Sequence, residues 1–238
     1  MMLELREEWL RKVMPDGLPY PSSTLVSGPG GTGKPLVVLG FVANWLRKGG
    51  KVVGIPLQYP TMDFVEKAMK SLYGMDISEY DVTFVQFDPS IDEYKEEEHL
   101  RANLLKPDVW DHIVDNYVDK DTMLFGSALN LLLFSPTYKA AILDKIDELL
   151  KSGDKTYMFS VSTSAFYNLI ERWEKSADNL MFTRMEGFGN LKFRVEKLKE
   201  GKYLKDAIDV PIPKEVLMEI KDVAEHTRKR IIPTVSKI

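Results

Sequence analysis

Apolar residues along the chain follow two alternating patterns, short unbroken runs and longer stretches with a helical period. The short runs are rich in Val, Ile, Leu and Phe, which is typical of parallel strands covered on both faces. The longer stretches carry apolar residues three or four positions apart, which predicts helices that pack on a sheet. Strands are predicted at 23–27, 51–57, 81–87, 121–127 and 155–162, and helices at 34–48, 61–74, 96–105, 107–118, 136–151, 164–175 and 214–229.

Glycine, proline and hydroxyl residues mark several ends of these predicted elements. Gly74 and Gly153 each follow the last turn of a predicted helix, where glycine readily adopts the left-handed conformation. Thr61 is expected to cap the helix at 61–74, and Pro136 suits a first helical position, where no N–H group is needed. The helix at 34–48 is apolar on nearly every side, so we expect it to be buried.

Two further runs, 179–184 and 191–199, flank the residues Glu-Gly-Phe-Gly-Asn at 186–190. This arrangement predicts an antiparallel hairpin at one edge of the sheet. No repeat, linker or low-complexity segment interrupts the pattern. The sequence therefore predicts an α/β fold with a mainly parallel central sheet flanked by helices. We expect a single domain over 1–238, with a core at about 10–205 and a C-terminal helical tail at 206–238.

The composition excludes several classes of protein. The chain has no cysteine, which excludes disulfides, and its 3 histidines are far apart, so no metal site is predicted. No apolar run approaches the roughly 20 residues of a membrane span, and the N-terminus lacks the apolar region of a signal peptide. The formal net charge is −4, and ten acids gather within 92–121. We therefore expect a cytoplasmic protein with no membrane segment and no nucleic acid partner.

Residues 28–34 read Gly-Pro-Gly-Gly-Thr-Gly-Lys, between a predicted strand and a predicted helix. This spacing in this context predicts a phosphate-binding loop. Glycines let backbone N–H groups point at phosphate oxygens, the helix N-terminus adds positive potential, and the lysine adds a charge. We expect ATP or ADP as ligand. The candidate binding residues are Gly28, Gly30, Gly31, Thr32, Gly33, Lys34, Pro35 and Leu36.

The stretch GLPYPSSTLVSGPGGTGKPL at 17–36 resembles the opening of the RecA-superfamily ATPases related to the clock protein KaiC. The similarity continues in order through GGKVVGIPLQYP, GMDI, the predicted strand at 121–127, SADNLMFTR and VEKLKEGKY. It covers about residues 10–205. The resemblance implies a RecA-like P-loop NTPase core and an ATP site at the edge of a subunit interface. It also implies self-association, as a ring or a dimer.

The chain departs from this family where Mg²⁺ and the attacking water would be held. Pro35 replaces the hydroxyl residue that binds Mg²⁺, and it also lacks a backbone N–H group. By the resemblance, Gln58 and Tyr59 stand at a pair of glutamates, one of which activates water. Gln58 keeps only the ability to orient a water molecule. Bound Mg²⁺ is therefore doubtful, and no catalytic residue is assigned.

Two more family positions are altered. The strand at 121–127 has Gly126 where the family has an aspartate that steadies Mg²⁺, and Ser127 follows it. Asp121 begins the same strand, but five residues at about 3.3 Å each place it roughly 16 Å away. Lys197 and Lys199 stand where the family has a Lys-x-Arg pair that reaches a neighbouring subunit's nucleotide. The positive charge is kept there, but the arginine fork is lost.

Three functions are compatible with the sequence. The first is a degenerate P-loop protein that binds ATP or ADP weakly, hydrolyses it poorly or not at all, and has a regulatory or scaffolding role. The second is an active ATPase related to recombinases that acts on DNA, supported by the basic residues 228–230. The third is a protein-interaction module whose amphipathic tail helix at 214–229 docks on a partner. The missing carboxylates favour the first.

Overall fold

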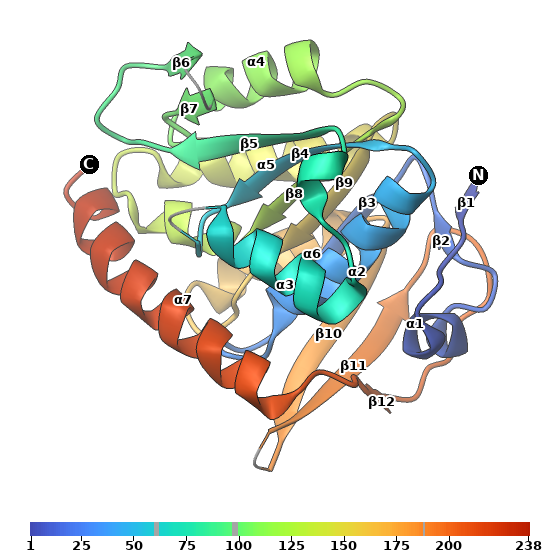
Figure 1. The fold of residues 1–238 in the computed structure, drawn as a ribbon. Coiled ribbons are helices and arrows are strands. Elements are labelled where there is room, and N and C mark those ends of the chain that lie inside the picture. Colours follow the sequence, from blue (N-terminus) through green and yellow to red (C-terminus); the bar gives the residue numbers. More distant parts are fainter. Residues whose placement is uncertain (60–61, 97–99, 188) are drawn as a thin grey trace.

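The computed structural model describes residues 1–59, 62–96, 100–187 and 189–238 (Figure 1). The predicted α/β fold is confirmed, with helices on both faces of a large central sheet. The strands of the described part are β1 (Met2–Leu3), β2 (Leu18–Pro19), β3 (Ser23–Ser27), β4 (Lys51–Pro56), β5 (Val82–Phe87), β6 (Tyr94–Glu96), β7 (Leu100–Ala102), β8 (Thr122–Ser127), β9 (Thr156–Ser160), β10 (Asn179–Glu186), β11 (Asn190–Lys197) and β12 (Ile208–Asp209).

The large sheet has the strand order β12-β11-β10-β3-β9-β8-β4-β5-β7-β6. The strands from β10 to β7 in this order all pair in parallel. Antiparallel pairing in this sheet joins β10 to β11, β11 to β12 and β7 to β6, and β10 with β11 forms the predicted hairpin near one edge. The carboxyl ends of the parallel strands consequently lie along one edge of the sheet, where ligands of open α/β folds bind.

Two hydrophobic clusters fill the two faces of the sheet. The first includes α1, α2 and α3, and the second includes α4, α5, α6 and η2. Strands β3, β8 and β9 are buried along their whole length, as the apolar run at 121–127 predicted for β8. The helices are α1 (Glu8–Val13), α2 (Lys34–Arg47), α3 (Asp63–Tyr73), α4 (Pro107–Tyr117), α5 (Lys139–Ser152), α6 (Tyr167–Ser176) and α7 (Lys214–Val235), with 3₁₀ helices η1 (Ile77–Glu79) and η2 (Leu129–Phe134).

Helix α7 joins the two clusters. Leu217 near its start is buried in the first cluster, whereas Val235 at its end is buried in the second. The helix therefore crosses the molecule on the side where the parallel strands end (Figure 1). It is longer than the predicted 214–229, and part of the apolar face that was considered for a partner is buried in the chain's own core. None of the described helices is long and apolar enough to cross a membrane.

The predicted helix at 96–105 is wrong. Strand β6 ends at Glu96, strand β7 covers 100–102, and the two strands pair antiparallel, while residues 97–99 lie outside the described part of the chain. Leu100 and Ala102 are buried while Arg101 between them is half-buried, which is a strand's period of two. Charged residues with helical propensity masked this alternation in the sequence.

Two predicted helix starts also shift. Helix α5 begins at Lys139 because Pro136 lies in a turn, which Ser135 stabilises by accepting a hydrogen bond from the Tyr138 amide at 3.0 Å. Helix α6 begins at Tyr167 rather than at 164. The predicted cap at Thr61 falls outside the described residues.

Candidate nucleotide-binding site

The glycine loop joins β3 to α2 at the carboxyl edge of the sheet. Two of its glycines are required by close packing. A Cβ atom on Gly28 would lie 2.3 Å from the carbonyl oxygen of Thr183, and one on Gly33 would lie 3.0 Å from methyl groups of Leu191 and Leu217. Gly33 also has a φ of 58°, a left-handed conformation that glycine adopts without strain. Packing against β10, β11 and α7 therefore fixes the path of the loop.

Lys34 lies beneath this loop with 4 % of its surface exposed. Its Nζ donates hydrogen bonds to the carbonyl oxygens of Gly28 at 2.9 Å and Pro29 at 2.5 Å, and to Thr32 Oγ1 at 3.2 Å. Burial, assisted by the positive charge of Arg228, lowers the pKa of Lys34 to about 7. Its bonded acceptors are all uncharged, so a phosphate oxygen would be a stronger partner for the ammonium group.

Some of the other predicted loop residues form hydrogen bonds within the protein, whereas Gly31 is open to solvent. Gly31 is exposed, and a Cβ atom there would meet nothing within 4 Å. The Gly30 amide donates to Ser164 Oγ at 2.8 Å, and the Leu36 amide donates to the Gly33 carbonyl at 2.9 Å. Buried Thr32 contacts Thr183 Oγ1 at 2.7 Å. Hydrogen bonds to neighbouring residues therefore hold the loop at Gly30 and Thr32, whereas Gly31 is open to solvent.

Pro35 is buried in the first turn of α2, where its missing N–H group breaks no helical hydrogen bond. The helix thus tolerates the residue. Proline supplies neither the hydroxyl oxygen that a bound Mg²⁺ would use nor an amide for a phosphate. The change preserves the fold and removes two polar contacts from the site.

Apolar side chains crowd Gly126, the position at which the family resemblance places a carboxylate. A Cβ atom on Gly126 would lie 2.9 Å from Leu129 Cδ2 and 3.2 Å from Phe159 Cδ1. The chain turns back after β8 through Ala128, whose φ is 57°, and this turn brings Leu129 against the end of the strand. Ser127 beside it is buried, and its Oγ has no hydrogen-bond partner among the described residues. The metal-binding position is therefore filled by apolar side chains.

Gln58 and Tyr59, which stand where the family has two glutamates, carry no carboxylate. Gln58 is half-buried in the turn after β4. Tyr59 is 6 % exposed and stacks on Phe64, with ring centroids 4.3 Å apart. Its hydroxyl has no hydrogen-bond partner in the described structure, and burial raises the pKa of Tyr59 well above its ordinary value. Neither residue is a general base.

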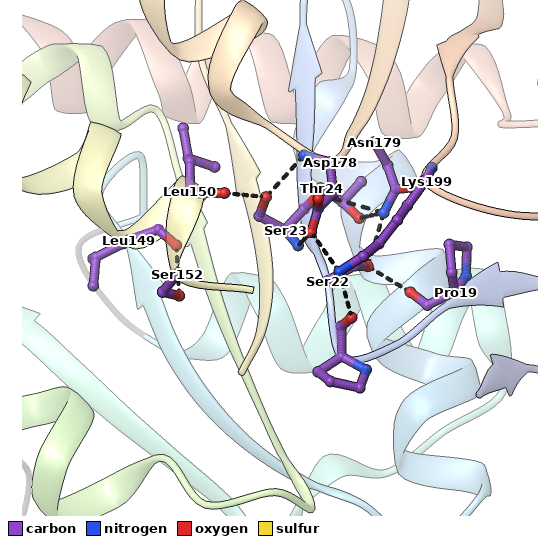
Figure 2. Close-up of polar contacts among 11 residues, drawn as sticks. Pro19, Ser22, Ser23, Thr24, Leu149, Leu150, Ser152, Asp178, Asn179 and Lys199 are labelled. Atoms are coloured by element: carbon purple, nitrogen blue, oxygen red, sulfur yellow. Dashed lines mark hydrogen bonds and ion pairs between the residues drawn. The ribbon is translucent and has the colours of Figure 1, made fainter. Parts of the chain in front are cut away.

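Lys197 and Lys199 lie away from the loop of their own chain. Lys197 is paired with Leu180 of β10, which is paired with Leu25 in the middle of β3, and Lys199 lies two residues further toward the amino end of β3. The Lys199 amide donates to Asn179 Oδ1 at 2.9 Å, and its Nζ forms an ion pair with Asp178 at 3.2 Å (Figure 2). The register therefore excludes these lysines from the phosphate loop of the same chain.

Helix α7 brings a residue to the loop that the sequence did not place. A Cβ atom on Gly30 would lie 3.4 Å from Arg228 Nη1 and 3.4 Å from Ser162 Oγ. The sequence marked residues 228–230 only as a basic segment of the tail. In the sequence, Arg228 is one basic residue of an amphipathic helix. Nothing in the local pattern indicates that it contacts the phosphate loop.

A cavity of about 590 Å³ lies between the ends of β4 and β5 and the second half of α7, and none of the loop residues 28–36 lines it. It is lined by aromatic and aliphatic side chains, with Arg230 among them. Tyr59 and Thr227 also line it, and the Thr227 hydroxyl, like that of Tyr59, has no hydrogen-bond partner among the described residues. Among all the residues that the structure describes, no group of three or more Asp, Glu or His side chains could hold a metal ion. The two positions at which the family holds Mg²⁺ are Pro35 and Gly126, which supply no side-chain oxygen and therefore do not fit the ion.

A parallel sheet with a glycine loop and a buried lysine at its carboxyl edge defines a P-loop ATPase with a RecA-like core. More narrowly, the chain belongs to the KaiC ATPase family, since the model of the family described as "ATPase: KaiC" matches residues 8–177. None of the curated protein sequences matches the chain. The family was therefore correctly identified from the loop and the motifs that follow it.

Solved structures show the same fold. The KaiC-like protein PH0186 from Pyrococcus horikoshii OT3 is 15 % identical, with a TM-score of 0.67 over 90 % of this chain and 96 % of that one. The flagellar accessory protein FlaH from Methanocaldococcus jannaschii is 18 % identical, with a TM-score of 0.62 over 87 % of this chain and 92 % of that one. At these identities the likeness concerns the fold alone.

Proposed function

We propose that the chain binds ATP or ADP at residues 28–36 and hydrolyses it slowly or not at all. One observation carries this proposal. The loop keeps its glycines and Lys34, while Leu129 fills the space beside Gly126 where a catalytic metal site needs a carboxylate. Binding and turnover depend on different groups of this site, so one can persist without the other.

Binding is supported by the donors that remain. Lys34 already lies within the loop, so phosphate oxygens would replace the carbonyl oxygens it now contacts. The start of α2 adds positive potential, and Gly31 leaves the loop open at its tip. These groups recognise phosphate regardless of the base, whereas the choice of ATP or ADP follows from the family.

Slow turnover follows from the groups that are absent. Phosphoryl transfer depends on a metal ion, an oriented nucleophile and a charge clamp. Pro35 and Gly126 remove two metal contacts, and Tyr59 is stacked and unable to take a proton at neutral pH. Losing one such group commonly costs a few kcal/mol of barrier, or orders of magnitude in rate. With several lost, we propose a regulatory or scaffolding role in the cytoplasm.

Self-association belongs to the same proposal. Lys197 lies level with the middle of β3 and Lys199 lies nearer its amino end, away from their own loop, so a neighbour's nucleotide is the partner they would reach. Light scattering after gel filtration, with and without ADP, would measure the assembly. A monomer at micromolar concentration under both conditions would remove this part of the proposal.

Calorimetric titration with ATP and ADP, together with an ATPase assay, tests the main proposal. We expect wild-type binding that is lost in Lys34→Ala and kept in Lys175→Ala, an exposed lysine paired with Glu171. We expect turnover no faster than about 10⁻³ s⁻¹, the scale of an unassisted GTPase. Absence of nucleotide binding, or turnover near 1 s⁻¹ that Lys34→Ala abolishes, would contradict the proposal.

A further inference from the structure

Two cations from distant parts of the sequence meet at the phosphate loop. Lys34 lies beneath it, and the Arg228 guanidinium reaches it from α7, 3.4 Å from the Cβ position of Gly30. Arg228 Nε donates to the Ala224 carbonyl at 3.3 Å, one turn earlier, which directs the side chain back along the helix. The charge of Arg228 is felt at Lys34, since it contributes to the low pKa of the lysine.

No acid compensates these two charges in the described part of the chain. Arg228 forms no ion pair there, and Lys34 contacts only carbonyl and hydroxyl oxygens. Like charges in a partly buried site repel each other, and an anion between them would relieve the repulsion. The hydroxyls of Ser162 and Ser164 lie at the same place and can donate to such an anion.

We propose that Lys34 and Arg228 together neutralise the phosphates of a nucleoside di- or triphosphate that is bound without Mg²⁺. This inference rests on the proposed nucleotide binding and assigns to α7 a part of the site. A guanidinium matches two phosphate oxygens at once and carries its charge at every physiological pH. It can thus supply the positive charge that a metal ion supplies in an active P-loop ATPase.

The construction of α7 supports this role. Leu217 packs beside Gly33 and Val235 is buried at the far end, so both halves of the helix are held on the core. Arg228 lies between these two anchors. The arginine is consequently positioned by its own chain, without a neighbouring subunit, and little ordering remains to be done when the phosphates bind.

The experiment is calorimetric titration with ADP, ATP and inorganic pyrophosphate, in EDTA and again in Mg²⁺. The variants are Arg228→Gln, Arg228→Lys and Lys229→Gln, the last being a matched control at the next residue of α7, an exposed lysine paired with Glu225. We expect wild type to bind ADP and pyrophosphate in EDTA as tightly as in Mg²⁺, within about threefold. Arg228→Gln should weaken both ligands by about ten- to a hundredfold, the usual size for a charge-assisted contact.

The controls separate this inference from the proposed function. Lys229→Gln should change affinity by less than about twofold, and Arg228→Lys should lose less than Arg228→Gln because it keeps the charge. Circular dichroism melting confirms that each variant folds. If ADP binds and Lys34→Ala abolishes it while Arg228→Gln binds like wild type, the inference fails and the proposed function stands. A requirement for Mg²⁺ in wild type also overturns the inference. Absence of binding in every wild-type titration overturns both.

Discussion

The two ends of the central strands differ in how their buried polar groups are satisfied. At the amino end, Asn179 is fully buried and its side-chain amide donates to Ser22, Ser23 and Thr24 at 2.8–3.3 Å (Figure 2). Its Oδ1 accepts from the Lys199 amide. Every polar atom of this side chain thus has a partner, and the network joins β3 and β10.

At the carboxyl end of the strands, several buried polar groups lack a hydrogen-bond partner among the described residues. The hydroxyls of Ser127 and Ser160, on neighbouring strands β8 and β9, are buried without a hydrogen-bond partner in the described structure. Lys34 is buried close to the positive Arg228. A buried hydroxyl without a hydrogen-bond partner, or a buried cation near another cation, lowers the stability of the folded protein. The comparison indicates that the amino end holds the fold together, whereas the carboxyl end keeps polar groups that a ligand could use.

The largest effect is expected from Asn179→Leu, which breaks the amino-end network. The Lys199 amide would lose its acceptor and several buried oxygens would lose a donor. We expect the free energy of unfolding to fall by about 3 kcal/mol, since each unsatisfied buried group costs about 1–3 kcal/mol. Urea denaturation followed by circular dichroism measures it. Arg184→Gln, on the exposed face of the same strand, should change it by less than about 0.5 kcal/mol. Equal losses in both variants would refute the distinction.

The parts of the fold that the sequence predicted are those governed by local pattern. Short apolar runs rich in strand-forming residues identified β3, β8 and β9, and the glycine loop followed from its position between a strand and a helix. The helix expected at 96–105 failed because pairing between β6 and β7 outweighs the helical propensity of charged residues.

The unpredicted parts of the site arise from contacts across the fold. The apolar surroundings of Gly126 depend on a left-handed turn at Ala128 and on Phe159 from the next strand, and neither is visible in the motif. Arg228 reaches the loop at Gly30 only because α7 crosses the carboxyl edge of the sheet. Family motifs mark which groups are missing, but not which residues from elsewhere take their place.

An intermediate effect is expected from pH at the carboxyl end. Burial, with Arg228, lowers the pKa of Lys34 from 10.5 to about 7. Between these values the unfolded chain keeps a proton that the folded chain has lost, so folded stability rises with pH. Relative to Lys34→Met, wild type should gain about 2 kcal/mol of unfolding free energy from pH 7 to pH 9. Urea denaturation at pH 6, 7 and 9 checks this.

The control for the pH experiment comes from the amino end. The difference between wild type and Asn179→Leu should stay constant between pH 7 and pH 9, because an amide does not titrate. Arg228→Gln should shrink the pH-dependent gain of wild type, because one cause of the lowered Lys34 pKa is removed. A wild-type gain below about 0.5 kcal/mol would mean that Lys34 is not held as a costly buried charge.

The smallest effect is expected from a matched pair of serines, one at each end. Ser23 Oγ donates to the Leu150 carbonyl at 2.6 Å and accepts from the Asp178 amide at 2.9 Å, whereas Ser127 Oγ has no partner among the described residues. Ser23→Ala should lower the free energy of unfolding by about 1 kcal/mol. Ser127→Ala should leave it unchanged or raise it by up to about 1 kcal/mol, because a buried unpaired hydroxyl is removed. Parallel urea titrations decide the matter. If Ser127→Ala costs as much as Ser23→Ala, the carboxyl end is a bonded structural network like the amino end, and the contrast between the two ends is lost.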